Sequence, residues 1–297
     1  MGIFANPLTD LLEYEDFSRD FLKGTDPVGM TGCIDSEKVH FMSTFLGEKK
    51  VQLVVTYNEQ RAREIEEDYK LFCSQVYVIP PRDLIFFSAD LQGNAIIAER
   101  MKAFAALYQN EAKVIITTMD ALMSAAVPFE QLMSHVIKLK EGDELDLEKL
   151  KHDLTVMGYE RVGRVEEPGQ FTVHGGIADV YPLTMEVPVR IELWGDEIDT
   201  IRCFEPQSQR SMDQIECVSV FPAAEVIADD TARRRAAGMI QNELESQLAV
   251  FKKAKEPDKA KRLREETNRI LEALGEDVVL EAPDSYISYF YPRTVQL

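Results

Sequence analysis

The first 128 residues alternate short apolar runs with longer amphipathic ones. The apolar runs are β-branched and nearly free of polar residues, which is typical of strands buried on both faces. The amphipathic runs carry apolar residues at helical spacing, and Asn58 stands where the first of them needs an N-cap. The predicted strands are residues 51–56, 76–79 and 113–117. Three helices are predicted: one starts after Asn58, the second covers residues 94–108, and the third covers about 120–124. Three alternations of strand and helix predict a parallel sheet covered by helices.

The pattern changes after Pro128 and a charged stretch at residues 138–152. Residues 158–220 alternate with period two and are broken by turn residues, which predicts an antiparallel meander. Within it, Val189, Ile191 and Leu193 are expected on one face. The side chains between them, Arg190, Glu192 and Trp194, should therefore lie on the other face.

A third pattern begins after Pro222. Residues 230–274 contain one proline, Pro257, and are rich in Ala, Glu, Lys, Arg and Leu, so they predict one or two helices. The aromatic segment 285–291 is expected to be a strand or a buried loop. The chain is therefore predicted to have three parts: an α/β domain, an inserted antiparallel α+β domain, and a helical segment that packs back on the first domain. Their predicted ranges are 1–128, 129–223 and 224–297.

Composition narrows the class of protein. The chain is 45% hydrophobic and 29% charged, which suits packed globular domains and excludes a disordered or fibrous chain. No apolar run is long enough to span a membrane, and the first twenty residues lack the basic and apolar pattern of a secretion signal. The four cysteines form no C-x-x-C pair. A reduced, cytoplasmic protein is expected.

The charge balance argues against direct binding of DNA by this chain. Its 33 basic and 52 acidic residues give a net charge of −19, and none of the three predicted parts has an excess of basic residues. Such a chain repels a phosphate backbone unless basic residues gather on one face. The basic run Arg233–Arg235 is interpreted as a solvated helix face.

Residues 29–36 (GMTGCIDS) stand where a phosphate-binding loop is expected, before the first helix. The opening glycines are present, but Ile34 replaces the last glycine and Asp35 replaces the phosphate-binding lysine. An acid facing a triphosphate costs free energy, and a β-branched residue resists the required backbone angles. The loop therefore predicts an ordinary strand-to-helix turn without nucleotide.

Other catalytic chemistry finds no support in the sequence. The four histidines, at positions 40, 135, 152 and 174, lack metal-ligand spacing, and no serine lies in a nucleophile motif. We therefore expect no catalytic residue, no metal and no cofactor in this chain.

The second part carries a distinctive set of motifs. They are GYERV at 158–162, PGQFTVHGGIADVYP at 168–182, PVRIELWGDEID at 188–199 and FEPQSQRS at 204–211. Together they resemble the UvrB-homology module of bacterial nucleotide excision repair. Two families share this module, UvrB itself and the transcription-repair coupling factor, Mfd. The degenerate phosphate loop and the short segment 80–94, too poor in tyrosine for the DNA-inserting hairpin of UvrB, resemble the N-terminal module of the second family.

The resemblance implies a degenerate RecA-like first domain and a middle domain that docks onto UvrA. Residues matching the family's contact positions are Arg161, Phe171, His174, Arg190 and Glu192. His174 stands where the family usually has arginine, and Thr172 replaces a second arginine of UvrB. From the residues alone, Arg190 and Glu192 could equally pair across a solvated face. Trp194 is expected to be a packing residue.

The resemblance also implies what the longer family protein does. The chain would be a non-catalytic module that recruits UvrA to stalled RNA polymerase within an ATP-dependent DNA translocase. ATP, magnesium, RNA polymerase and DNA would then be bound by other parts of that protein. Two alternatives stay open, a UvrB-like excinuclease subunit with nucleotide-dependent helicase activity and an interaction module outside repair.

Overall fold

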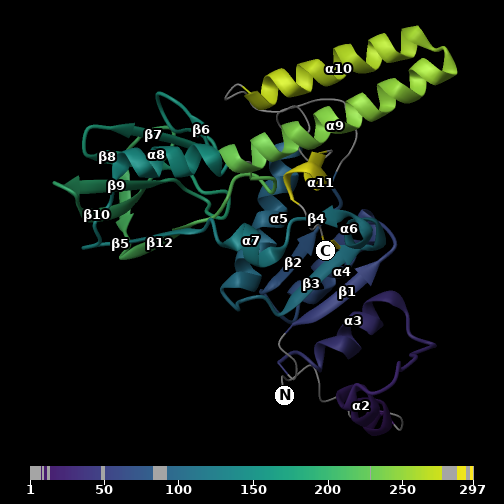
Figure 1. Ribbon diagram of the computed structural model, residues 1–297. Helices are drawn as coiled ribbons and strands as arrows, with labels where there is room; N and C mark the ends of the chain where they lie inside the picture. Colours follow the sequence, from purple (N-terminus) through teal and green to yellow (C-terminus); the bar gives the residue numbers. More distant parts are fainter. Residues whose placement is uncertain are drawn as a thin grey trace. The chain divides into compact units, whose positions relative to one another are not determined.

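The computed structural model describes residues 8, 10–11, 14–47, 51–82, 92–227, 229–275, 286–291 and 295–296 (Figure 1). Backbone contacts divide the chain into two compact units. The first comprises residues 1–82 and 102–124, and the second comprises residues 83–101 and 125–297. The division into three parts expected from the sequence stays a prediction.

The first unit is built on a three-stranded parallel sheet in the order β1-β3-β2. Its elements are α2 (Tyr14–Lys23), α3 (Asp35–Ser43), β1 (Gln52–Thr56), α4 (Glu59–Lys70), β2 (Val76–Ile79), β3 (Val114–Thr118) and α6 (Met119–Met123). Helix α5 (Gln92–Tyr108) runs across the boundary between the two units. The three predicted strands and their parallel pairing are confirmed.

Helix α4 shows why the local prediction succeeded. The Asn58 side chain accepts a hydrogen bond from the Arg61 backbone N–H (2.8 Å), as an N-cap should. Ala62, Ile65 and Tyr69 are buried at helical spacing and pack against β2 and β3. The expectation that every strand is buried on both faces is wrong for β1.

Strand β1 lies at an edge of the sheet, and its side chains alternate between half-buried and exposed. Leu53 is 59% exposed and Val55 is 40% exposed. The central strand β3, in contrast, is buried at all five positions. Apolar character therefore predicted the strand correctly but not its place in the sheet.

The second unit contains a six-stranded sheet in the order β11-β10-β9-β8-β7-β6. Its strands are β6 (Glu160–Arg161), β7 (Gln170–His174), β8 (Ile177–Val180), β9 (Val189–Trp194), β10 (Glu197–Phe204) and β11 (Ser211–Gln214). All neighbours are antiparallel except β6 and β7, so the predicted meander is largely confirmed. A separate pair, β5 (Ile137–Lys140) and β12 (Cys217–Val220), is also antiparallel.

One face of this six-stranded sheet is the core of the domain. Helix α8 (Leu147–Val156) contributes Leu150 and Leu154 to the same buried cluster as the sheet residues Phe171, Val189 and Ile191. Asp146 caps α8 by accepting hydrogen bonds from two backbone N–H groups. The opposite face is therefore left for polar side chains.

Two long helices follow this sheet, as predicted for residues 230–274. They are α9 (Asp230–Ala254) and α10 (Pro257–Gly275), which pack side by side as an antiparallel pair (Figure 1). Lys255 ends α9 in the left-handed conformation, and Pro257 begins α10, where its missing N–H costs no hydrogen bond. The remaining elements of the unit are α7 (Phe129–Met133), α11 (Ile287–Phe290), β4 (Ala125–Ala126) and β13 (Val295–Gln296).

The expectation of a strand or loop at residues 285–291 is wrong where the structure describes it, because residues 287–290 form the short helix α11. Ile287 and Phe290 are buried, and the Tyr291 hydroxyl donates to the Ile227 carbonyl at 2.9 Å. Within the described part of the chain, no helix is long and apolar enough to cross a membrane.

The fold class is therefore mixed α/β, with a parallel sheet and antiparallel sheets. The RecA-like assignment of the first unit stays a prediction. Residues 29–34 are not a strand-to-helix turn as expected, since the element before them in the described chain is helix α2. Residues 83–91, which bear on the missing hairpin of UvrB, lie outside the described residues.

Candidate docking face

The polar face of the six-stranded sheet is set by strand alternation. Val189 and Ile191 are buried on the core side, whereas Arg190 and Glu192 are half-buried on the other side, as predicted. Cross-strand pairing aligns Arg190 with Asp179 and with Arg202, and Glu192 with Ile177. We call this surface the docking face. It comprises Thr172, His174, Ile177, Asp179, Arg190, Glu192, Trp194, Thr200 and Arg202.

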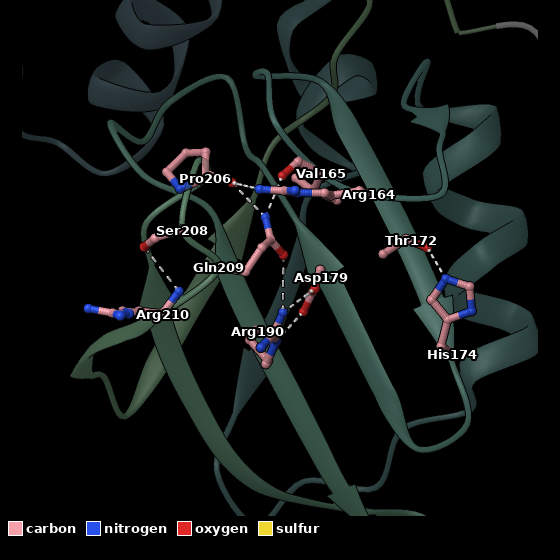
Figure 2. Close-up of polar contacts among 10 residues, drawn as sticks. All are labelled: Arg164, Val165, Thr172, His174, Asp179, Arg190, Pro206, Ser208, Gln209 and Arg210. Atoms are coloured by element: carbon pink, nitrogen blue, oxygen red, sulfur yellow. Dashed lines mark hydrogen bonds and ion pairs between the residues drawn. The ribbon is translucent and has the colours of Figure 1, made fainter.

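Arg190 and Asp179 form the centre of the docking face (Figure 2). The Arg190 Nε and Nη2 atoms lie 2.8 and 2.7 Å from the two carboxylate oxygens of Asp179, a bidentate pair. The side chains are 22% and 8% exposed. The hydrogen bond that Arg190 donates to Asp179 raises the pKa of Arg190, so this guanidinium stays charged. Its Cζ also lies 4.8 Å from the centre of the Phe204 ring, within cation–π range.

The loop between β10 and β11 contacts the Arg190–Asp179 pair through Gln209. Gln209 accepts from Arg190 Nη2 at 3.5 Å and donates from Nε2 to the Pro206 and Val165 carbonyls. Its backbone is left-handed, with φ of 60°, which closes the loop over the Arg190 guanidinium. Arg164 donates to the Pro206 and Gln207 carbonyls (Figure 2). The motif at 204–211 is therefore a structural support for Arg190.

The other end of the docking face is more exposed and more apolar. Trp194 is 84% exposed, and Ile177 is 40% exposed. His174 is exposed, and its Nε2 lies 2.9 Å from the Thr172 hydroxyl (Figure 2). Glu192 accepts a hydrogen bond from the Thr200 hydroxyl at 3.4 Å. The expectation that Trp194 is a packing residue is wrong, because it ends β9 on the side away from the core.

Two of the five predicted contact residues lie elsewhere. Phe171 is completely buried in the core cluster and has no surface to offer a partner. Arg161 is exposed on β6, paired in register with Phe171. Its neighbour Val162 packs with Phe204 on the side of the docking face, so alternation points Arg161 to the opposite side. The expected single face with Arg161, Arg190 and Glu192 is therefore wrong for Arg161.

Sequence reasoning missed four residues of this surface, Ile177, Asp179, Thr200 and Arg202, and it missed Gln209 in the loop beside it. Asp179 could have been found by pairing β8 with β9 across the connection at residues 181–188, because that register places it opposite Arg190. Arg202 lies beside Arg190 on β10, and its buried Nε has no hydrogen-bond partner within the described part of the chain. No sequence signal distinguishes Gln209, because its role depends on the fold of the loop.

Comparisons with known proteins agree with this geometry. Residues 137–225 match the family model of the UvrB interaction domain. The chain is 33% identical over 258 residues to the transcription-repair-coupling factor of Staphylococcus haemolyticus, covering 86% of this chain and 21% of that protein. It is 29% identical over 299 residues to the transcription-repair-coupling factor of Bacillus subtilis, covering 98% and 25%. The chain thus spans about a fifth to a quarter of these relatives.

The sheet and the family match together define a protein with a UvrB interaction domain. The chain is similar over most of its length to part of the transcription-repair-coupling factors, which confirms the resemblance found in the sequence.

Proposed function

We propose that this chain is a non-catalytic recruitment module that binds UvrA through the docking face. The observation that carries the proposal is that the family match and one folded sheet domain cover nearly the same residues. The residues that match the UvrB interaction domain, 137–225, contain α8, the six-stranded sheet and the β5–β12 pair, which together span residues 137–220. A sheet with one face in the core and an ordered, charged and aromatic opposite face suits a protein interface.

The composition of the docking face supports a protein partner. Arginine, tryptophan and tyrosine dominate binding energy at protein interfaces, and Trp194 and Arg190 both lie on this face. A guanidinium held by Asp179 and Gln209 is already in place before binding, so less conformational entropy is lost. His174, Arg190 and Glu192 stay proposed contacts, and Trp194 joins them. Phe171 packs in the core on the other side of the sheet.

The non-catalytic part of the proposal is supported by the start of α3. Asp35 lies 3.5 Å from Arg61 Nη2 and 3.3 Å from Lys38 Nζ, so its carboxylate occupies the first turn of the helix. Glu37 accepts a hydrogen bond from the Ile34 N–H at 3.2 Å. Carboxylates therefore fill the position where helix N-terminal N–H groups would bind a phosphate. The UvrB-like alternative, which needs nucleotide, is disfavoured.

The wider role follows from the family and is part of the same proposal. Within a longer cytoplasmic protein, this module would bring UvrA to RNA polymerase stalled on DNA, while other parts supply the ATP-driven motor. The experiment that tests recruitment is sedimentation velocity of the 297-residue chain mixed with purified UvrA. A discrete complex at micromolar concentrations is expected, and two independently sedimenting species would contradict the proposal.

A further inference from the structure

The tip of the α9–α10 hairpin carries a concentration of positive charge that the docking face does not use. Residues 252–264 contain seven basic residues and only two acidic ones, in a chain whose net charge is −19. The basic residues are Lys252, Lys253, Lys255, Lys259, Lys261, Arg262 and Arg264, and all are exposed. They come from the last turn of α9 and the first turns of α10, so the turn at Lys255 brings them together (Figure 1).

Most of these cations are not neutralised within the chain. Lys259 pairs with Glu256 at 2.9 Å, and Lys261 pairs with Glu265 at 3.9 Å. Among the described residues, the remaining five make no ion pair. A hollow of about 590 Å³ opens between the two helices at this point. Lys252, Lys255, Lys261 and Arg264 line it together with Glu256 and Glu265, so cations outnumber acids around a concave surface that could receive an anion.

The kind of residue indicates the kind of partner. Lysine is depleted at protein interfaces, whereas lysine and arginine supply the phosphate contacts of nucleic-acid-binding proteins. Residues 252–264 contain no Ser, Thr, Asn or Gln that could read a base edge or a ribose hydroxyl. Phe251 is half-buried and is the one aromatic residue lining the hollow, so no stacking platform for single strands is present there. These features favour the phosphate backbone of a duplex.

The acidic residues of α9, Asp230, Glu243 and Glu245, precede the tip along the helix, and the nearest of them lies seven residues, about 10 Å, before Lys252. Twenty-five helical residues span about 37 Å, and charges in about 0.15 M salt are screened within about 8 Å. The cations at the tip therefore act on nearby phosphates despite the net charge of the chain. We propose that the α9–α10 tip is an auxiliary, sequence-independent contact for the backbone of duplex DNA.

The contact is expected to be weak and strongly dependent on salt. Three to five phosphate contacts predict a fall in affinity of roughly 100-fold between 50 and 200 mM salt. Binding is therefore detectable at low ionic strength and negligible near 150 mM. Such a contact would add affinity only when another part of the same protein already holds the DNA.

The test is fluorescence anisotropy of the 297-residue chain with a labelled 20-base-pair duplex DNA of mixed sequence, from 25 to 200 mM NaCl. The tip variant combines Lys252→Gln, Lys255→Gln and Arg264→Gln. The control variant combines Lys140→Gln, Lys149→Gln and Arg210→Gln, three exposed cations away from the tip, so both variants change the net charge equally.

At 50 mM salt, the tip variant should bind at least 10-fold more weakly than wild type, and the control variant within threefold. The slope of log affinity against log salt should fall by about 2.7 in the tip variant. Unchanged melting curves are expected, because the substituted side chains are exposed. Equal loss in the two variants, no binding by wild type at 25 mM, or tighter binding of duplex RNA or poly-L-glutamate at the tip would overturn the proposal.

Discussion

The Arg190–Asp179 pair shows how much a single contact changes the effect that a residue is expected to have on stability. From alternation alone, Arg190 is an exposed arginine whose loss should barely change stability. In the structure its guanidinium covers a carboxylate that is 8% exposed and rests on the Phe204 ring. Removing one partner of such a pair leaves the other charge desolvated and unpaired. Arg190 therefore stabilises the domain as well as shaping the docking face.

Replacing Arg190 with alanine should lower the free energy of unfolding by about 1–3 kcal/mol, less than for a fully buried pair because Arg190 is partly solvated. Urea denaturation followed by circular dichroism measures this change. Arg210→Ala is the matched control, because Arg210 is exposed in the loop between β10 and β11 and should change stability by less than about 0.5 kcal/mol. Equal stability of the two variants would show that Asp179 needs no partner.

Glu225 illustrates the same lesson outside the docking face. Its place beyond the sequence motifs suggests a neutral control position. In the structure it is buried and holds Arg100, which is completely buried, through two hydrogen bonds of 2.5 and 3.2 Å. Sequence separation hid this pair, because 125 residues lie between the partners.

Tyr69 predicts how stability depends on pH at the alkaline end. Burial raises the pKa of Tyr69 to about 12 from its usual value near 10, and its hydroxyl lies 3.1 Å from Gln52 Oε1. The folded state therefore favours the neutral phenol. The contribution of Tyr69 to the free energy of unfolding is complete below pH 10 and is lost as the pH rises through 12.

The free energy of unfolding should fall by about 2 kcal/mol between pH 10 and pH 12 on account of this residue. In Tyr69→Phe that part of the fall should be absent. Guanidinium denaturation of both proteins across this range measures the difference. The same alkaline fall in both proteins would assign it to other tyrosines.

At the scale of elements, the sequence predicts the helices and strands whose formation depends on residues close together in the chain. Apolar runs located the three parallel strands, helical spacing located α4, alternation assigned the faces of β9, and composition located α9, since each depends on one segment of the chain. The parallel pairing of β6, the edge position of β1 and the helix α11 depend on partners far along the chain. That is why Arg161 was assigned to the wrong side of the sheet.

The cap of α4 gives an element-scale prediction. Asn58→Ala removes the hydrogen bond to the Arg61 N–H and should cost about 1 kcal/mol of stability. Asn58→Asp, which keeps an oxygen acceptor, should retain most of it. Chemical denaturation of the three proteins tests this, and alanine and aspartate variants of equal stability would contradict the role of the cap.

At the scale of the whole molecule, the first unit is expected neither to bind nor to hydrolyse ATP. Asp35, in the first turn of α3, forms ion pairs with Lys38 of the same helix and with Arg61 of α4. Ile34, just before it, is 71% exposed. A triphosphate approaching this loop would meet a carboxylate instead of a lysine. Isothermal titration with Mg-ATP should show no saturable heat at sub-millimolar levels. Magnesium-dependent release of phosphate by the purified chain would contradict this expectation.

The candidate site was therefore predictable in its chemistry but not in its construction. The family motifs and strand alternation pointed to His174, Arg190 and Glu192, which do share one face. Asp179, Gln209 and the exposed Trp194 emerge only when strands and loop are assembled. Phe171 was assigned to the surface because an aromatic residue in a motif gives no sign of which way its strand faces.

The most direct test of the central claim is the affinity of UvrA for variants of the docking face that leave the core intact. Trp194→Ala and Glu192→Lys change side chains that are exposed or half-exposed, so folding should be retained. Met239→Ala and Glu148→Lys are matched controls on α9 and α8. Titration calorimetry should show each docking-face variant weakened by about 2 kcal/mol, roughly 30-fold, and both controls near wild type. Wild-type affinity in both docking-face variants, with normal melting curves, would place the UvrA contact on another surface.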